Sequence, residues 1–187
     1  MPTIAIVDGV RLVIHLRDNL PPHLHAIFAD SEAQISIVTG EVLHGSLPRA
    51  KMRAVQGWLA ANREEAAYMW VEREPGRAAK GCGMKLHRIT GVEPVRYPVL
   101  QVTFDDGLSG EYDLTDIIDE GPLFAPLKDE AYFRTVSVVP SGRSFGWNLD
   151  VEGEEIDFCP DATRIKIETN IVEELAARYR RRRTAAE

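Results

Sequence analysis

Apolar and polar residues alternate along the first third of the chain with the two-residue period of half-buried strands. Thr3 to Val7 and Val10 to Leu16 alternate in this way, and Asp8-Gly9 between them is a two-residue hairpin signal. Further short strands are predicted over residues 23–28, 34–38 and 41–44. The pattern therefore predicts an antiparallel meander of about five short strands.

After Gly45 the period of the apolar residues changes from two to about 3.6, which is typical of a helix. Pro48 stands near the expected helix start, where its missing N–H does no harm. The predicted apolar stripe consists of Met52, Val55, Leu59, Ala66 and Met69. Trp58 and Trp70 lie near this stripe and are expected to anchor the helix on the sheet.

The strongest break in the pattern lies between Glu74 and Gly83, where a proline and three glycines oppose regular structure. We expect two small modules on either side of it and an α+β fold, in which each module is a mainly antiparallel sheet. The predicted divisions are a sheet-plus-helix module (1–77), a linker (78–84), a mainly β acidic module (85–168), and a basic C-terminal helix and tail (169–187).

The second module repeats the strand pattern. Val99 to Phe104 and Leu108 to Leu114 flank Asp105-Asp106-Gly107 and predict a hairpin, in which Leu100, Val102 and Phe104 face inward. Other strands are predicted over 86–92, 136–139, 145–148 and 155–158. A helix is predicted from about Ile171 to Arg183, with Asn170 and Glu173 at the spacing of a capping box.

Charge separates the acidic second module from a basic C-terminal end. The 187 residues carry a net charge of -7, which argues against a general nucleic-acid coat because phosphate binding needs a clustered basic surface. The C-terminal arginines are Arg178, Arg180, Arg181, Arg182 and Arg183. They predict a contact with nucleic acid or an acidic partner, with a solvated tail as the alternative.

Cysteine spacing and hydropathy indicate a reduced environment and no membrane segment. Cys82 and Cys159 form no CxxC pair, which favours free thiols over a disulfide framework or a cysteine zinc site. No apolar run approaches the roughly 20 residues of a membrane helix, and the first ten residues lack a basic start before an apolar core. We expect a cytoplasmic protein.

The best chemical candidate is the stretch around two histidines. Pro21-Pro22 stiffens the entry to His23 and His25, which project from the same face of a strand and are expected at the surface. The predicted binding surface comprises Asp18, Pro21, Pro22, His23, His25 and His44.

Three roles stay open for the two histidines. They could ligate a metal with Asp18, His15 or His44 as a third ligand, hold an anion when protonated, or serve the structure alone. The sequence does not show that these side chains meet. It therefore assigns no catalytic residue, metal ligand or cofactor.

Several motifs of the first half resemble a bacterial family labelled domain of unknown function 4160. The matching motifs are Met1-Pro2-Thr3-Ile4, Pro21-Pro22-His23-Leu24-His25, Gly45-Ser46-Leu47-Pro48-Arg49, and the tract from Trp58 to Trp70 with Asn62-Arg63-Glu64-Glu65. The family usually has Asp-His-Asn before the two prolines. Here Asp18 is followed by Asn19 and Leu20, so one histidine of the family pattern is missing.

The second half resembles another bacterial family, domain of unknown function 2442, over roughly Lys85 to Arg164. The matching residues are Val102 to Gly107, Tyr112-Asp113-Leu114, Phe124 to Asp129, Tyr132-Phe133, Trp147, and Asp157 to Asp161. The family normally has Trp-Pro-Asn-Gly close before its Asp and Pro, whereas here a glutamate-rich insertion separates Trp147-Asn148 from Asp157.

Together the two resemblances imply a fusion of families whose genes often lie side by side in arrangements like toxin-antitoxin modules. The expected function is a non-catalytic interaction or regulatory protein with a protein partner or self-association. One alternative is a hydrolase, acting on RNA or dependent on a metal, that uses His23 and His25. Another is a small-ligand or anion binder between the modules.

Overall fold

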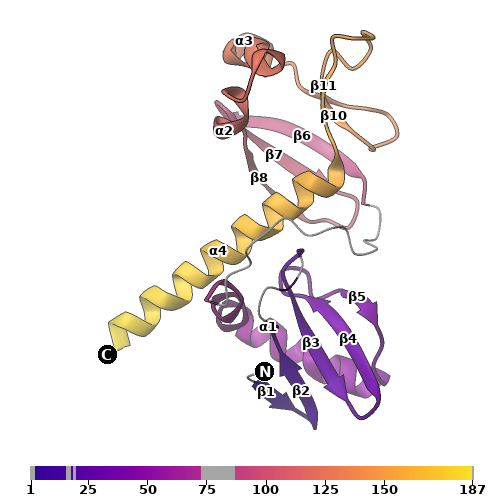
Figure 1. Cartoon of the computed structure of the whole chain (residues 1–187), viewed down its shortest axis with the longest axis vertical. Helices are drawn as coiled ribbons and strands as arrows, with labels where there is room; N and C mark the ends of the chain where they lie inside the picture. The colour runs from indigo at the N-terminus through magenta and orange to yellow at the C-terminus, as the bar shows by residue number, and fades with distance from the viewer. Residues whose placement is uncertain (1–2, 16–17, 19, 73–86, 187) are drawn as a thin grey trace. The chain divides into compact units, whose positions relative to one another are not determined.

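The computed structural model describes residues 3–15, 18, 20–72 and 87–186 and has an α+β fold (Figure 1). The chain divides into two compact units. Unit 1 comprises Met1–Lys85 and Glu168–Glu187, and unit 2 comprises Leu86–Ile167. The predicted break from Glu74 to Gly83, with the linker and Cys82, lies outside the described residues. Within the described residues, no helix has the length and apolar character needed to cross a membrane.

Unit 1 is built on a five-stranded antiparallel sheet in which the strands follow one another in chain order. Its strands are β1 (Thr3–Val7), β2 (Val10–Val13), β3 (His23–Phe28), β4 (Ser31–Ser36) and β5 (Val42–Gly45). The predicted meander is therefore confirmed, because each strand is set by local alternation and short turns. Gly45 has a φ of +72° and packs directly on the backbone of Glu32, so a side chain there would collide with that carbonyl.

Helix α1 (Arg49–Val71) follows the sheet and supplies the apolar face that the stripe predicted. Val55, Leu59 and Ala66 are fully buried, as are Leu12 and Leu24 on paired strands of the sheet. The helix departs from helical backbone angles at Asn62, whose side chain donates to the Trp58 carbonyl oxygen over 2.8 Å. This departure divides α1 into two segments, and the second of them carries Trp70.

Unit 2 holds two three-stranded antiparallel sheets with short helices between them. Its elements are β6 (Ile89–Arg96), β7 (Val99–Phe104), β8 (Ser109–Asp113), α2 (Thr115–Ile118), η1 (Pro122–Lys128), α3 (Glu130–Phe133), β9 (Ser137–Val138), β10 (Phe145–Trp147) and β11 (Ile156–Phe158). The predicted inward residues of β7, Leu100, Val102 and Phe104, are buried. Trp147 is fully buried, and its indole N–H donates to the Phe133 carbonyl oxygen over 2.9 Å.

The last helix, α4 (Pro160–Ala186), begins eleven residues before the predicted start at Ile171. The predicted capping box is therefore wrong, because Asn170 and Glu173 lie inside the helix. Pro160 and Asp161 instead mark the start, where proline fits the first turn and an acidic residue complements the helix dipole. The first part of α4 belongs to unit 2, and the part from Glu168 belongs to unit 1.

Candidate metal centre

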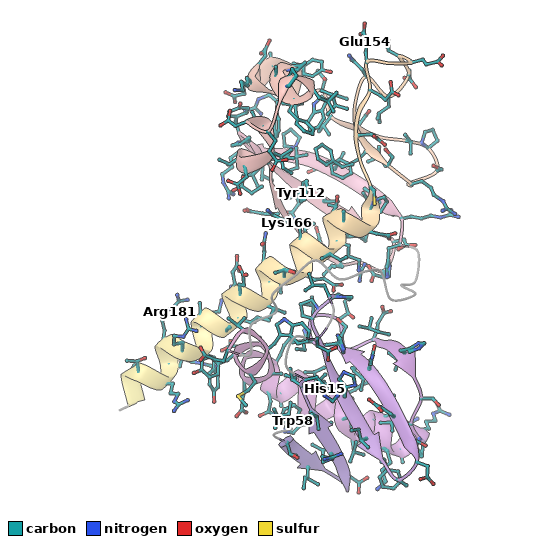
Figure 2. The ribbon with its side chains drawn as sticks, in the orientation of Figure 1. His15, Trp58, Tyr112, Glu154, Lys166 and Arg181 are labelled. Carbon is teal, nitrogen blue, oxygen red and sulfur yellow. The ribbon has the colours of Figure 1, made fainter. Side chains whose placement is uncertain are left out.

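The histidine cluster of unit 1 is assembled by strand periodicity and register. His23 and His25 share one face of β3, because side chains two residues apart point the same way. The antiparallel register sets Gln34 opposite His25, and this places the neighbouring Glu32 of β4 on the same face. Asp18, from the segment before β3, completes the cluster (Figure 2 labels the neighbouring His15).

His25 lies at the centre of the cluster and contacts a carboxylate with each ring nitrogen. Its Nδ1 lies 2.6 Å from Oε1 of Glu32, and its Nε2 lies 2.7 Å from Oδ2 of Asp18. Both distances are those of charge-assisted hydrogen bonds. With a proton on each nitrogen, His25 would be a cation held between two carboxylates.

The orientation of His23 follows from its backbone partner. Its Nδ1 lies 2.9 Å from the carbonyl oxygen of Pro21, which accepts hydrogen bonds only, so Nδ1 carries the proton. The lone pair of Nε2 is thereby directed into the cluster, 3.2 Å from Nε2 of His25 and 3.3 Å from Oδ2 of Asp18. His23 thus directs its Nε2 at two other polar atoms.

Burial and neighbouring charges shift the pKa values of His25 and His15 in opposite directions. Burial alone would lower the pKa of His25, yet the hydrogen bonds with Asp18 and Glu32 and their negative charges raise it above the ordinary value of histidine. The pKa of His15 is lowered by burial and by the positive charge of His25, whose ring packs edge-on against it at 4.1 Å between centroids. His15 is therefore the neutral member of this pair near pH 7.

Both central histidines are buried, so the prediction of a surface pair is wrong. His23 is 3% exposed and packs against the Trp70 ring, and His25 is 6% exposed and contacts the His15 ring and the two carboxylates. The carboxylate side is more open, with 15% of the Asp18 side chain and 52% of the Glu32 side chain exposed. The carboxylates are therefore the most exposed members of the cluster.

Two overlapping groups of side chains in unit 1 have the composition and spacing of metal ligands. One comprises Asp18, His23 and His25, and the other comprises His15, His25 and Glu32. The first group is the better candidate, because its three atoms lie 2.7 to 3.3 Å apart. Ligand atoms around a tetrahedral ion with bonds of about 2.0 Å lie roughly 3.3 Å apart.

The atoms behind this group also match a metal centre. Metal-binding histidines usually donate their second N–H to a carbonyl or carboxylate, which fixes the ring and increases its basicity. His23 does so to Pro21, and Nδ1 of His25 does so to Glu32. The arrangement leaves two Nε2 atoms and one carboxylate oxygen to share a cation.

The remaining candidates for the predicted binding surface have different roles. Pro22 is buried, and its carbonyl accepts a hydrogen bond from the amide of Ile37 over 3.0 Å. His44 is exposed on β5 and pairs with Gln34, which in turn pairs with His25. Two strand spacings of about 4.8 Å separate His44 from His25, so His44 is outside the cluster.

The C-terminal arginines mostly contact carboxylates. Arg180 lies 2.7 Å from Glu72 and over the ring of Tyr68, and Arg182 pairs with Glu64. Arg178 lies 3.6 Å from Glu174 on its own helix, while Arg181 is exposed (Figure 2). The predicted contact with nucleic acid stays a prediction.

Sequence reasoning missed two residues of the site. Glu32 was not a candidate, although it shares the two-residue period of Gln34 and Ser36 on the face that β4 presents beside His25. Trp70 was expected to anchor the helix on the sheet, and it does more, since its ring packs against His23 at 5.4 Å between centroids.

Comparison with known proteins identifies one region of the chain. Residues 9–71 match the family described as domain of unknown function 4160, so the resemblance of the first half is confirmed. That region contains all the side chains of the cluster. The resemblance of Lys85 to Arg164 to a second family, and with it the fusion, stays a prediction. No curated protein and no solved structure matches the chain.

Proposed function

We propose that unit 1 is a divalent-metal-dependent hydrolase whose metal is held by Asp18, His23 and His25. The observation that carries this proposal is the convergence of three potential metal-ligand atoms, Oδ2 of Asp18 and the Nε2 atoms of the histidines, within 3.3 Å of one another. A shared proton satisfies only the closest pair of them. A divalent cation would satisfy all three.

The donor set favours a transition metal of the zinc type. Imidazole nitrogen and carboxylate oxygen suit Zn²⁺, Fe²⁺ and Mn²⁺ better than Ca²⁺, which prefers six to eight oxygens. Binding would displace the proton between His25 and Asp18, so metal affinity would fall as the pH decreases.

A site with three protein ligands is more typical of a catalytic metal than of a structural metal. Structural zinc sites normally have four protein ligands, whereas catalytic sites have three and keep one position for water. A metal-bound water loses a proton near neutral pH and becomes a nucleophile. Asp18, His23 and His25 would hold the ion, and the ion would supply an activated water whose oxygen and proton would add across the hydrolysed bond.

The test is a metal titration of the full chain. Protein stripped with a chelator is titrated with Zn²⁺, Co²⁺ and Mn²⁺ by calorimetry, and metal content is measured after dialysis. We expect one ion per chain, and a loss of at least a hundredfold in affinity in His23→Gln and His25→Gln. His44→Gln is the matched control, because this exposed histidine lies on the same sheet outside the cluster.

Two outcomes would contradict the proposal. The metal site would be contradicted if the wild-type chain took up no ion. It would also be contradicted if His23→Gln and His25→Gln bound the ion as tightly as His44→Gln. Hydrolysis is then checked with bis(p-nitrophenyl) phosphate and p-nitrophenyl acetate as probes. If the metal-loaded protein turns over neither probe faster than its His25→Gln variant, unit 1 binds a metal but is not a hydrolase for these esters.

A second candidate is the interaction role expected from the sequence, and one observation favours it. Strand β1 is at the edge of the sheet and exposes 71% of Ile6. An apolar edge strand can pair with a strand of another chain. If self-association uses this edge, Ile6→Lys should convert dimers to monomers in light scattering, whereas a monomeric wild-type chain would oppose self-association there.

A further inference from the structure

Trp70 is the large side chain that packs against the metal centre from α1. Its ring lies 5.4 Å from the ring of His23 between centroids, at an angle of 51°. It is 3% exposed, so it forms part of the wall behind His23.

The indole nitrogen of Trp70 has no hydrogen-bond partner within the described residues, although it is buried. Indole Nε1 is a donor only, and burying it without an acceptor destabilises the folded chain. The buried Trp147 shows the usual solution, since its Nε1 donates to the Phe133 carbonyl oxygen over 2.9 Å. An unused donor beside a candidate metal centre indicates a position for an acceptor atom.

A second buried donor without a partner lies on the same face of α1. Arg63 precedes Trp70 by seven residues, which is close to two helical turns, and its Nε has no hydrogen-bond partner either. The opposite face carries Glu64 and Glu72, which pair with arginines of α4. Both unused donors therefore face away from α4 and add positive character to the side of α1 that carries Trp70.

We propose that the centre binds a phosphoryl group, with one phosphoryl oxygen accepting a hydrogen bond from Nε1 of Trp70. This inference rests on the proposed metal at Asp18, His23 and His25, which would take a second phosphoryl oxygen. The divalent cation would attract an anion at its open coordination position, while the carboxylates of Asp18 and Glu32 together balance its charge. The guanidinium of Arg63, about 10 Å along the same face of α1, adds longer-range attraction that is larger for a dianion than for a carboxylate. The substrates of the centre would then be phosphate esters.

The test uses the full chain loaded with Co²⁺, whose visible absorption reports changes in its ligands. Inorganic phosphate is titrated into the wild-type chain, Trp70→Phe and Trp58→Phe. Trp58 is the matched control, because it is a half-buried tryptophan of the same helix (Figure 2). In Trp70→Phe we expect Co²⁺ affinity to stay within about threefold and phosphate affinity to fall by about tenfold or more, the effect of losing a hydrogen bond to a charged group. Trp58→Phe should leave both unchanged.

A second measurement uses the wild-type chain, so its result does not require that a variant folds. In wild-type protein labelled with ¹⁵N at its three tryptophans, the indole N–H signal of Trp70 should move downfield on adding phosphate to the metal-loaded chain, while that of Trp147 stays fixed. The Trp58 signal, identified with Trp58→Phe, should also stay fixed.

The outcomes separate this inference from the proposed function. A chain that binds Co²⁺ but shows neither a spectral change nor a Trp70 shift with phosphate would overturn the phosphoryl site and leave the metal centre intact. Equal phosphate affinity in Trp70→Phe and wild type, or equal binding of acetate and phosphate, would also overturn it. Failure of the wild-type chain to bind Co²⁺ would contradict the metal centre itself.

Discussion

Each unit buries a cluster of ionisable side chains, but the two clusters balance charge differently. In unit 2, Arg164 donates to both carboxylate oxygens of Asp106, over 3.1 and 2.7 Å, so a permanent cation neutralises the carboxylate. In unit 1, Asp18 and Glu32 contact histidines, whose charge depends on a proton. Arg164 keeps its proton at ordinary pH, whereas the proton held by the histidine cluster is the one that the proposed metal ion would displace. The unit 2 cluster is therefore structural and the unit 1 cluster is a candidate for function.

The variant with the largest expected effect on stability breaks the pair of Arg164 and Asp106 in unit 2. Arg164→Met leaves a largely buried carboxylate without its cation, and removing one partner of a buried pair costs roughly 3–5 kcal/mol. We expect a loss of stability of about 3 kcal/mol in urea unfolding of the full chain. Arg96→Met is the control, because Arg96 pairs with Glu111 in the same two-point geometry at an exposed position. Equal losses of stability in Arg164→Met and Arg96→Met would show that the buried pair contributes no more than the exposed one.

Acid should weaken unit 2 through the same carboxylate. Burial would raise the pKa of Asp106, but hydrogen bonds from Arg164 and the Leu108 amide lower it from 3.8 to about 2. Because the folded pKa is the lower one, this stabilisation is present above about pH 4 and is lost as the pH falls toward 2. We expect a loss of about 2 kcal/mol over this range. In Asp106→Asn the pH dependence should shrink by the same amount, and an unchanged acid profile would contradict the assignment.

Glu32 tests the unit 1 side of the comparison. Its hydrogen bond with Nδ1 of His25 fixes the ring that presents Nε2 to the metal. Outer partners of this kind usually change metal affinity by about 10–100-fold. We expect Glu32→Gln to weaken Co²⁺ binding by about tenfold with one ion still bound, because glutamine keeps an acceptor but loses the charge. Glu41→Gln, another glutamate of this unit outside both ligand groups there, is the control. A complete loss of binding would make Glu32 a ligand, as in the alternative group with His15.

The differences between sequence and structure have physical reasons. The strands of unit 1 and the hairpin of unit 2 could be predicted because alternation and turn residues act within a few positions. The burial of His23 and His25 could not, since alternation gives the face of a strand but not what covers it. The contact of His25 with Glu32 depends on the register between β3 and β4. The contact of His25 with Asp18 depends on a segment whose sequence has no regular pattern. The start of α4 was missed because the predicted start rested on the capping-box spacing of Asn170 and Glu173, which lie inside the helix.

The smallest expected effect concerns the C-terminal arginines, whose carboxylate partners are exposed or partly exposed. Arg180 and Arg182 pair with Glu72 and Glu64 on α1, and such pairs usually contribute less than about 1 kcal/mol. We expect Arg180→Gln/Arg182→Gln to lose less than this in urea unfolding at low salt, and nothing at about 1 M salt, where screening is strong. Removing the helix would be a poorer test, because α4 also buries Val172 and Ala176.

The same variant tests the predicted contact with nucleic acid, since arginines that bind phosphate must leave their carboxylates. Phosphate contacts give a steep salt dependence, with log affinity for duplex DNA falling by about 0.9 per neutralised phosphate per decade of salt. A duplex that binds wild type at low salt should bind Arg180→Gln/Arg182→Gln more weakly and with a shallower slope. Glu64→Gln/Glu72→Gln should bind it more tightly, because it releases the same arginines. If neither pair of substitutions changes DNA binding, these arginines serve the contact between α4 and α1 alone.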